Sequence, residues 1–272
     1  METMKKEKDL QVEHLRAGYD DCVIIEDMDI CLKRHEITTL IGPNGCGKST
    51  ALKTITRILR KLGGNILLEG KNIQKMPTKE LAKKISVLSQ SQFTPADITV
   101  EELVAYGRIP WQKWYETEGT EDKDVVDWAL QAAAIDHMRK RRVSSLSGGE
   151  RQRAWIATAL AQKPEFLFLD EPTTYLDIAH QIEIMELVKE LNHKFKIGIV
   201  MVLHDIEQAM EVSDQIIVLK DGKKVAHGTP LEIITEQMIQ DVYHVSCQII
   251  YLENQSKPVI AYHSLTNRKV RI

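Results

Sequence analysis

A glycine-rich stretch constrains the possible fold more than any other part of the chain. Its pattern, G-x-x-x-x-G-K-[ST], is formed by Gly42, Pro43, Asn44, Gly45, Cys46, Gly47, Lys48, Ser49 and Thr50. The stretch follows the apolar run Ile37 to Ile41 and opens a segment, Lys48 to Leu59, whose apolar residues have helical spacing. In such a strand–turn–helix unit, backbone N–H groups and the positive end of the helix dipole surround an anion. The sequence therefore predicts a phosphate-binding loop.

The side chains of this loop suit nucleotide phosphates accompanied by Mg²⁺. We expect Lys48 to neutralise the β- and γ-phosphates and the Ser49 hydroxyl to ligate the metal ion. Cys46 is expected to be a small residue of the loop whose oxidation would block the nucleotide.

Two more apolar strands are predicted to end in polar residues. Phe166 to Leu169 leads into Asp170 and Glu171, and Ile197 to Leu203 leads into His204. Because ligands of parallel α/β sheets bind outside the carboxyl ends of strands, these residues should converge on the phosphate loop. We predict that Asp170 holds the Mg²⁺ water shell, that Glu171 polarises the attacking water as general base, and that His204 contacts the γ-phosphate. Two acids at a strand end can also be merely solvated, but the phosphate loop favours the catalytic interpretation.

A second anion site is predicted at a different place in the chain. Ser147 and Glu150 fit the S-x-x-E capping box, which predicts that the segment Arg151 to Gln162 is a helix. Gly148 and Gly149 leave backbone N–H groups exposed at this cap, as at a phosphate-sized site. A capping box by itself only starts a helix, so the second anion site needs a separate explanation.

Strand and helix patterns alternate along most of the chain, which predicts an α/β fold with a parallel sheet covered by helices. The other predicted strands are Leu10 to Leu15, Cys22 to Cys31, Asn65 to Glu69 and Ile85 to Ser89. The other predicted helices are Glu101 to Tyr106, Glu121 to Ala134 and Ile178 to Asn192. A helical insert therefore interrupts the α/β core, and an aromatic loop, Gly107 to Gly119, lies within it.

Composition excludes several classes of protein. The formal net charge of −3 gives no overall attraction to nucleic acid or anionic lipid, so we expect no nucleic-acid partner. No run approaches the roughly 20 apolar residues that span a bilayer, and the N-terminal segment lacks the apolar region of a secretory signal. Four scattered cysteines predict neither a disulfide framework nor a zinc site, and they favour a reducing cytosol.

Together these motifs resemble the nucleotide-binding subunit of the ATP-binding-cassette (ABC) transporters, and the resemblance covers essentially the whole chain. The segment Leu146 to Glu150 matches the signature motif of that family. In the family, two subunits pack head to tail, and each ATP lies between one phosphate loop and the partner's signature. The resemblance thus implies ATP hydrolysis with Mg²⁺ and a second copy of the chain as partner, which accounts for the second anion site.

The resemblance also implies a fold: a P-loop NTPase core with a parallel sheet, an N-terminal antiparallel β-subdomain and an inserted helical signature subdomain. The expected boundaries within the single 1–272 domain are a core of about 1–90 and 164–244, a helical subdomain of about 91–163, and a β tail of 245–272. Nothing in the sequence itself assigns a role to that tail.

Further site residues follow from the resemblance one at a time. Tyr19, expected before the first long strand, resembles the aromatic residue that stacks on adenine. Gln90 is similar to the glutamine that contacts Mg²⁺ and senses the permease. Leu176 and Asp177 resemble the loop that crosses the dimer interface.

Within the family, the chain is similar to ATPases for uptake of iron(III)-siderophores, haem and cobalamin. The supporting stretches are Ala105 to Pro110, Arg151 to Ala157, Glu171 to Gln181 and Leu203 to Ile206. The resemblance implies transmembrane permease subunits, an extracytoplasmic substrate-binding protein, and a peripheral location on the cytoplasmic face of the cell membrane.

The favoured interpretation is an importer ATPase for an iron(III)-siderophore or a related iron or haem chelate. The alternatives are a cobalamin importer ATPase, a soluble ABC ATPase not tied to transport, and a scaffold that binds nucleotide without turnover. Lys48, Asp170, Glu171 and His204 are all present, which argues against the scaffold.

Overall fold

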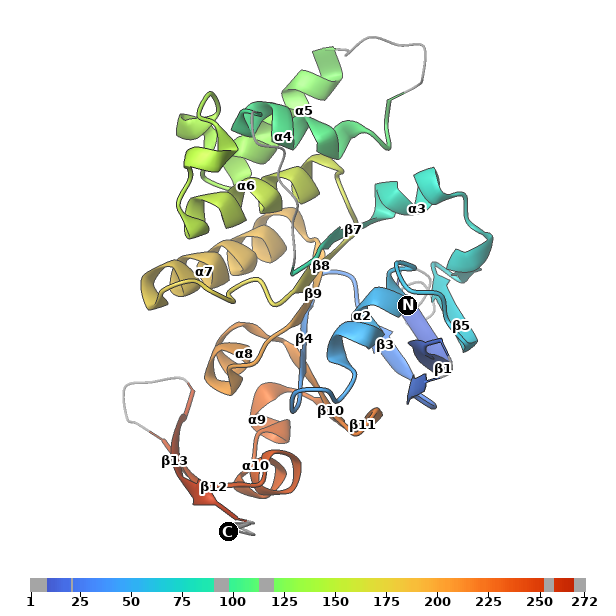
Figure 1. The fold of residues 1–272 in the computed structure, drawn as a ribbon, viewed down its shortest axis with the longest axis vertical. Helices are drawn as coiled ribbons and strands as arrows, with labels where there is room; N and C mark the ends of the chain where they lie inside the picture. Colours follow the sequence, from blue (N-terminus) through green and yellow to red (C-terminus); the bar gives the residue numbers. More distant parts are fainter. Residues whose placement is uncertain (1–8, 21, 91–97, 113–119, 252–256, 267–272) are drawn as a thin grey trace, which may run out of the picture.

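The central element is a six-stranded sheet with the order β11-β10-β4-β9-β8-β7 (Figure 1). The computed structural model describes residues 9–20, 22–90, 98–112, 120–251 and 257–266 of the chain. Five strands run parallel, and β11 pairs antiparallel with β10 at one edge. The strands are β4 (Ile37–Ile41), β7 (Ile85–Leu88), β8 (Phe166–Asp170), β9 (Gly198–Val202), β10 (Gln215–Lys220) and β11 (Lys223–Gly228). The predicted parallel α/β sheet is thereby confirmed, whereas β10 and β11 were not predicted.

Strand β8 explains why the central strands are continuously apolar. Phe166 and Phe168 belong to one hydrophobic core, and Leu167 and Leu169 belong to another on the opposite face of the sheet. Successive side chains of a strand point to opposite faces, so a strand covered on both sides needs apolar residues at every position.

A smaller antiparallel sheet packs beside the core that contains Phe166 and Phe168. It consists of β1 (Leu10–Tyr19), β2 (Cys22–Ile25), β3 (Ile30–Leu32), β5 (Gly63–Leu68) and β6 (Lys71–Asn72). The segment Cys22 to Cys31, predicted as continuous strand, is instead split between β2 and β3. The break lies at residues 26–29, where the carbonyl of Met28 accepts a hydrogen bond from the Leu15 N–H at 3.0 Å.

Three helices that lie between β7 and β8 in the sequence gather at one end of the molecule (Figure 1). They are α4 (Val100–Ala105), α5 (Thr120–Ala132) and α6 (Gly148–Ala161), and another helix, α3 (Thr78–Lys84), precedes β7. Helix α6 begins three residues earlier than predicted, because Ser147 is its N-cap residue. The predicted aromatic loop starts with a 3₁₀ turn at Tyr106–Arg108, and its residues 113–119 lie outside the described part of the chain.

The helix after the phosphate loop, α2 (Lys48–Ile55), is shorter than predicted. Arg57 adopts a left-handed φ of 64°, which ends the helical path, and the side chain of Ile58 is 56% exposed. The prediction that this helix continues to Leu59 is therefore wrong.

The C-terminal part of the chain adds helices and a hairpin. Its elements are α7 (Ile178–Phe195), α8 (Ile206–Val212), α9 (Pro230–Ile233), α10 (Glu236–Tyr243), β12 (Val245–Ile250) and β13 (Val259–Leu265). The β12–β13 hairpin lies at the opposite end of the molecule from α4 and α5 (Figure 1). It is attached to α8 by a hydrogen bond from the Ile260 N–H to Glu207 Oε1 at 2.8 Å.

Candidate functional site

Three neighbouring strands of the central sheet end at the same edge. Strand β4 leads into Gly42, β8 ends at Asp170, and β9 is followed by His204. Strand β9 lies between β4 and β8 and runs parallel to both, so these strand ends are adjacent. The predicted convergence of these residues is thus seen in the structure.

Glycine is required at the start of the phosphate-type loop. Gly42 has a φ of 149°, and a Cβ atom at this position would lie 2.1 Å from the carbonyl oxygen of Leu219 in β10. Gly47, with a φ of 104°, precedes α2 and packs against Ile24 of β2. The loop therefore turns tightly between two sheets, with its N–H groups at the positive end of α2.

Lys48 is buried within this loop, with 6% of its surface exposed. Its Nζ donates hydrogen bonds to the carbonyl oxygens of Gly42 at 2.8 Å and Pro43 at 3.0 Å. The ammonium group is thus fixed inside the loop, where it adds a full positive charge to the partial charges of the backbone. Cys46 is also buried, and burial raises the pKa of its thiol.

A hydroxyl and a carboxylate oxygen meet beside the loop. The Ser49 Oγ donates to Asp170 Oδ1 at 2.9 Å, and Asp170 is 4% exposed. Burial raises the pKa of Asp170, and the hydrogen bond from Ser49 opposes that effect. Hydroxyl and carboxylate oxygens are the donors that Mg²⁺ prefers, so this pair fits such an ion.

Glu171 receives interactions from three directions. Its carboxylate accepts hydrogen bonds from Gln90 Nε2 at 2.8 Å and Thr174 Oγ1 at 3.1 Å, and its Oε1 lies 2.6 Å from His204 Nε2. Glu171 has a φ of 54°, a conformation that non-glycine residues rarely adopt. The carboxylate faces a small hollow of about 160 Å³ whose lining also includes Tyr175 and His204. This geometry suits a group that accepts a proton from a bound water.

The signature turn, which comprises Leu146 to Glu150, is built separately from the strand ends. Ser147 Oγ accepts a hydrogen bond from the Glu150 N–H at 3.3 Å, and Glu150 Oε2 accepts one from the Ser147 N–H at 2.7 Å. The predicted capping box is therefore present. Within the described part of the chain, no hydrogen bond or ion pair joins Ser147, Gly148 or Gly149 to the strand-end residues.

The remaining predicted residues take diverse positions. Tyr19 is the last residue of β1 and is 43% exposed, so the expectation that it precedes the first long strand is wrong. The following strand, β2, packs on Gly47, which places the β1–β2 hairpin beside the phosphate loop. Asp177 is the N-cap residue of α7, and its Oδ1 accepts a hydrogen bond from the His180 N–H at 3.0 Å.

Sequence reasoning missed Thr174 and Gln208 as supports of the site. Thr174 donates a hydrogen bond to Glu171 directly, and Gln208 Nε2 donates to Gln181 Oε1 at 2.6 Å in the lining of the hollow. The spacing of Glu171 and Thr174, three residues apart in a turn, is a local signal for the first of these contacts. The second joins α7 to α8, and no local pattern indicates it.

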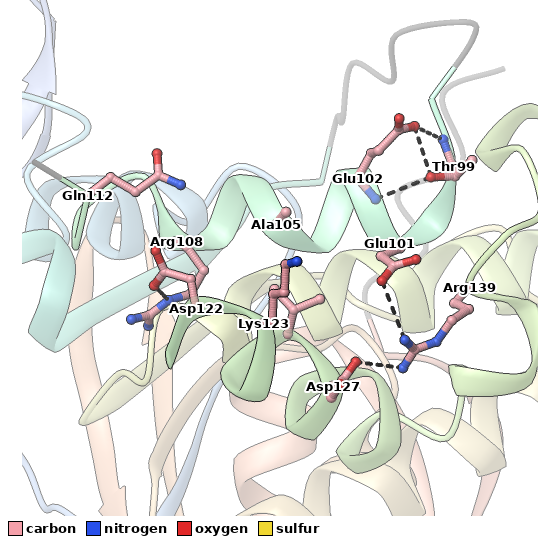
Figure 2. A pocket seen from close by; sticks show the side chains of 11 residues that line it. Thr99, Glu101, Glu102, Ala105, Arg108, Gln112, Asp122, Lys123, Asp127 and Arg139 are labelled. Atoms are coloured by element: carbon pink, nitrogen blue, oxygen red, sulfur yellow. Dashed lines mark hydrogen bonds and ion pairs between the residues drawn. The ribbon is translucent and has the colours of Figure 1, made fainter. Parts of the chain in front are cut away.

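A second hollow, of about 480 Å³, lies among the helices that separate β7 from β8 in the sequence (Figure 2). Arg108 is buried at its edge and pairs with Asp122 at 2.7 Å, while its Nη1 donates to the carbonyl of Ala161 at 2.8 Å. Arg139 pairs with Glu101 and Asp127 across the same hollow. The charged groups there connect α4, α5 and α6, and they hold this helical region together.

Residues 25–174 match the ABC transporter family. The chain is 45% identical to the iron(3+)-hydroxamate import ATP-binding protein FhuC of Bacillus subtilis, over 96% of this chain and 97% of that one. It is 44% identical to the ferric enterobactin transport ATP-binding protein FepC of Escherichia coli, over 89% of each chain.

Solved structures of ATP-binding cassettes are also similar to the chain. The cbiO1 subunit of the cbiONQ ABC transporter complex from Clostridium perfringens matches with a TM-score of 0.75 and 31% identity, covering 85% of this chain and 92% of that one. The dimeric post-hydrolysis state of the ATP-binding cassette MJ0796, bound to ADP and Pi, matches with a TM-score of 0.70 and 27% identity, covering 81% and 98%.

The chain therefore belongs to the ABC transporter family as an ATP-binding cassette. It binds and hydrolyses ATP, and its fold is the ABC ATPase fold. Among the residues that the structure describes, no helix combines the length and the apolar character needed to cross a membrane.

Proposed function

We propose that this ATPase drives an importer of iron(III)-siderophores, as a head-to-tail dimer bound to the cytoplasmic face of the cell membrane. The observation that carries this proposal is the separation of two anion-binding features, the Lys48 loop and the Ser147 turn, within one chain. A second copy would bring the turn of one chain to the loop of the other. Relatives named for iron(3+)-hydroxamate and ferric enterobactin transport support the substrate class.

In this proposal the residues of the strand ends divide the work of hydrolysis. The loop from Gly42 to Thr50 binds the phosphates of ATP, Lys48 compensates their charge, and Tyr19 stacks on the adenine. Ser49 and Asp170, joined by a hydrogen bond of 2.9 Å, hold Mg²⁺. The ion, when bound, neutralises charge that develops on the phosphate oxygens.

Glu171 takes a proton from the attacking water as the water oxygen bonds to the γ-phosphorus. The bond between the γ-phosphorus and the bridging oxygen breaks, and ADP keeps its electron pair. His204, 2.6 Å from Glu171 Oε1, orients the carboxylate and contacts the γ-phosphate. Gln90 donates to the same carboxylate through Nε2, which leaves its Oε1 as the amide atom that can contact Mg²⁺.

The same proposal assigns partners to two surfaces. Gln90 and the hollow near Arg108 face the transmembrane permease subunits. These subunits are separate polypeptides, and they receive the closing motion of the dimer. Asp177 crosses the dimer interface together with the signature residues Ser147, Gly148 and Gly149. An extracytoplasmic substrate-binding protein completes the importer. The domain boundaries that fit this arrangement are a core of about 1–90 and 164–244 and a helical subdomain of about 91–163.

Reconstituted vesicles test the substrate. The chain, its permease and the binding protein are assembled, and ATP hydrolysis is measured with iron-loaded hydroxamate and catecholate siderophores, haem and cobalamin. Stimulation by an iron-loaded siderophore but not by cobalamin is expected. Stimulation by cobalamin alone would assign the cobalamin alternative, and hydrolysis independent of any permease would favour a cassette not tied to transport.

Crosslinking tests the dimer. Isotopically light and heavy chains carrying Glu171→Gln are mixed with ATP and crosslinked, so that mass spectrometry distinguishes contacts between chains from contacts within one. We expect light–heavy crosslinks that join the peptide of residues 42–50 to the peptide of residues 146–150. Crosslinks that join these peptides only within one chain would reject the head-to-tail arrangement.

A further inference from the structure

The N-terminal ends of α6 and α7 touch each other within one chain. A Cβ atom built on Gly149 would lie 2.2 Å from Cδ2 and 2.8 Å from Cγ of His180. A Cβ atom on the neighbouring Gly148 would meet only the Leu176 Cδ2 atom, at 3.2 Å. The imidazole ring of His180 therefore covers Gly149 with no room for even a methyl group.

The ring of His180 is fixed in this place by Asp177. Asp177 Oδ1 accepts hydrogen bonds from the His180 N–H at 3.0 Å and from the ring Nδ1 at 2.8 Å. These bonds lower the pKa of Asp177, so the carboxylate is ionised at neutral pH and Nδ1 is the donor. The ring cannot turn away from Gly149 without losing its bond to the N-cap residue of α7.

The signature turn on the other side of this contact is equally restrained. The capping box of Ser147 and Glu150 fixes the first turn of α6, and Arg151 Nη2 donates to the carbonyl of Leu146 at 3.1 Å. The His180 ring thus lies between Asp177, to which it is hydrogen-bonded, and the backbone of Gly149.

We propose that His180 is a positioning residue that couples the Asp177 loop to the signature turn of the same chain. Its ring sets the place of the Gly148 and Gly149 N–H groups, which face the ATP bound to the other chain of the dimer. This inference rests on the proposed role of the signature turn. It also explains why position 149 requires glycine for a reason other than close approach to phosphate: the His180 ring occupies the space that a side chain would need.

A suppressor experiment tests the coupling. In the Glu171→Gln background, Gly149→Ala is expected to weaken ATP-dependent dimerisation, measured by analytical ultracentrifugation, about tenfold or more, because overpacking disturbs the first turn of α6. Adding His180→Ala removes the obstructing ring atoms and should restore dimerisation to the level of His180→Ala alone. If the methyl group instead blocks the phosphate, the second substitution restores nothing, and the inference is wrong.

His180→Asn is the matched control. Its side-chain amide keeps atoms where Nδ1 and Cδ2 of histidine lie, so it retains a donor for Asp177 but also the obstruction. We expect His180→Asn to fail as a suppressor of Gly149→Ala while it supports dimerisation with Gly149 intact. Equal rescue by alanine and asparagine would contradict a steric contact at Cδ2.

Two further measurements separate positioning from a general loss of structure. ATP binding to the isolated monomer should be the same in all variants, because the Lys48 loop is unchanged. In the assembled transporter with Glu171 intact, Asp177→Ala and His180→Ala should lower kcat with little change in KM, and the double variant should be no worse than either single one. Additive losses would mean that the two residues act independently.

Ser147→Arg separates this inference from the proposed function. If Ser147→Arg leaves ATP-dependent dimerisation intact, the signature turn has no role between chains, and the proposed function fails. If Ser147→Arg abolishes dimerisation but His180→Ala does not rescue the Gly149→Ala variant, the proposed function stands and only the coupling through His180 fails.

Discussion

The strand-end site and the signature turn are both suited to phosphate, but they are built in opposite ways. At the strand ends, Lys48, Ser49, Asp170 and Glu171 bond to other groups of the same sheet edge, and each has its partner inside the chain. The signature turn offers capped backbone N–H groups and no acid or base of its own that reaches the strand ends. In the proposed function, one region carries the reactive groups, and the other carries only backbone groups that recognise a nucleotide bound to the second chain.

In the proposed function, control over hydrolysis therefore depends on whether two chains are in contact. A site with all its parts in one rigid sheet hydrolyses whenever nucleotide is bound. A site that is completed by the signature turn of a second chain is active only while the two chains are associated. Substitutions in the two regions should therefore separate ATP binding from ATP turnover.

The largest effect is expected from Glu171→Gln. The variant keeps the size of the side chain, and its amide oxygen can still accept from Gln90 Nε2 and Thr174 Oγ1, but it cannot take a proton, so steady-state hydrolysis by the assembled transporter should fall by about 100-fold or more. ATP binding should be retained, because Lys48 and the loop are intact. Thr174→Val removes only a supporting hydroxyl and should cost about tenfold or less. Undiminished hydrolysis in Glu171→Gln would remove Glu171 from the role of base.

Ser147→Arg should be next in size and tests the other region. A long cation replaces the N-cap residue of α6, so it removes the cap and fills the space that the partner's nucleotide would occupy. We expect hydrolysis to fall about 100-fold while ATP binding to the isolated chain, followed by fluorescence titration, stays within about twofold. Equal loss of binding and hydrolysis would show that the turn acts within its own subunit.

Arg108→Ala tests how rigidly the helical region is held. The substitution leaves Asp122 half-buried without its partner and the Ala161 carbonyl without its donor, so we expect a loss of about 3–5 kcal/mol in the free energy of unfolding. Denaturant unfolding measures this loss. Lys123→Ala, exposed on the same hollow, is the control and should stay within about 0.5 kcal/mol (Figure 2). Equal stability of both variants would mean that the buried ion pair contributes nothing.

The smallest effect concerns the pH dependence of stability at the strand ends. Burial raises the pKa of Asp170 above 3.8, so ionising this group costs folding free energy at neutral pH. That cost disappears as the pH falls through the raised pKa towards 3.8. Asp170→Asn, neutral throughout, should therefore gain stability relative to the wild type at neutral pH, and the gain should shrink in acid. Thermal unfolding at several pH values without nucleotide measures it, and a difference that does not change with pH would contradict the prediction.

Much of the strand-end site was predictable because its parts carry local signals. The phosphate loop has a fixed spacing, and β8 and β9 are apolar runs that stop at Asp170 and near His204. Parallel strands meet at one edge, so convergence follows from the pattern alone. The capping box at Ser147 was equally visible, because its two residues are three positions apart.

The unpredicted features depend on segments that are distant in the sequence. Leu219 of β10 backs Gly42, and the His180 ring covers Gly149, yet neither pair leaves a periodic trace in the sequence. The early end of α2 depends on the left-handed residue Arg57, whose guanidinium donates to the carbonyls of Ile73 and Met76. Tertiary contacts of this kind override helical spacing.

The alternation of phenylalanine and leucine along β8 affects how precisely the register of this strand is specified during folding. If the strand slipped by one position against β9, Phe166 and Phe168 would exchange sides with Leu167 and Leu169, and each core would have to repack around side chains of a different size. The same slip would carry Asp170 to the wrong face and away from Ser49. The alternation of phenylalanine and leucine in β8 therefore favours one register, and that register places the Asp170 carboxylate beside Ser49.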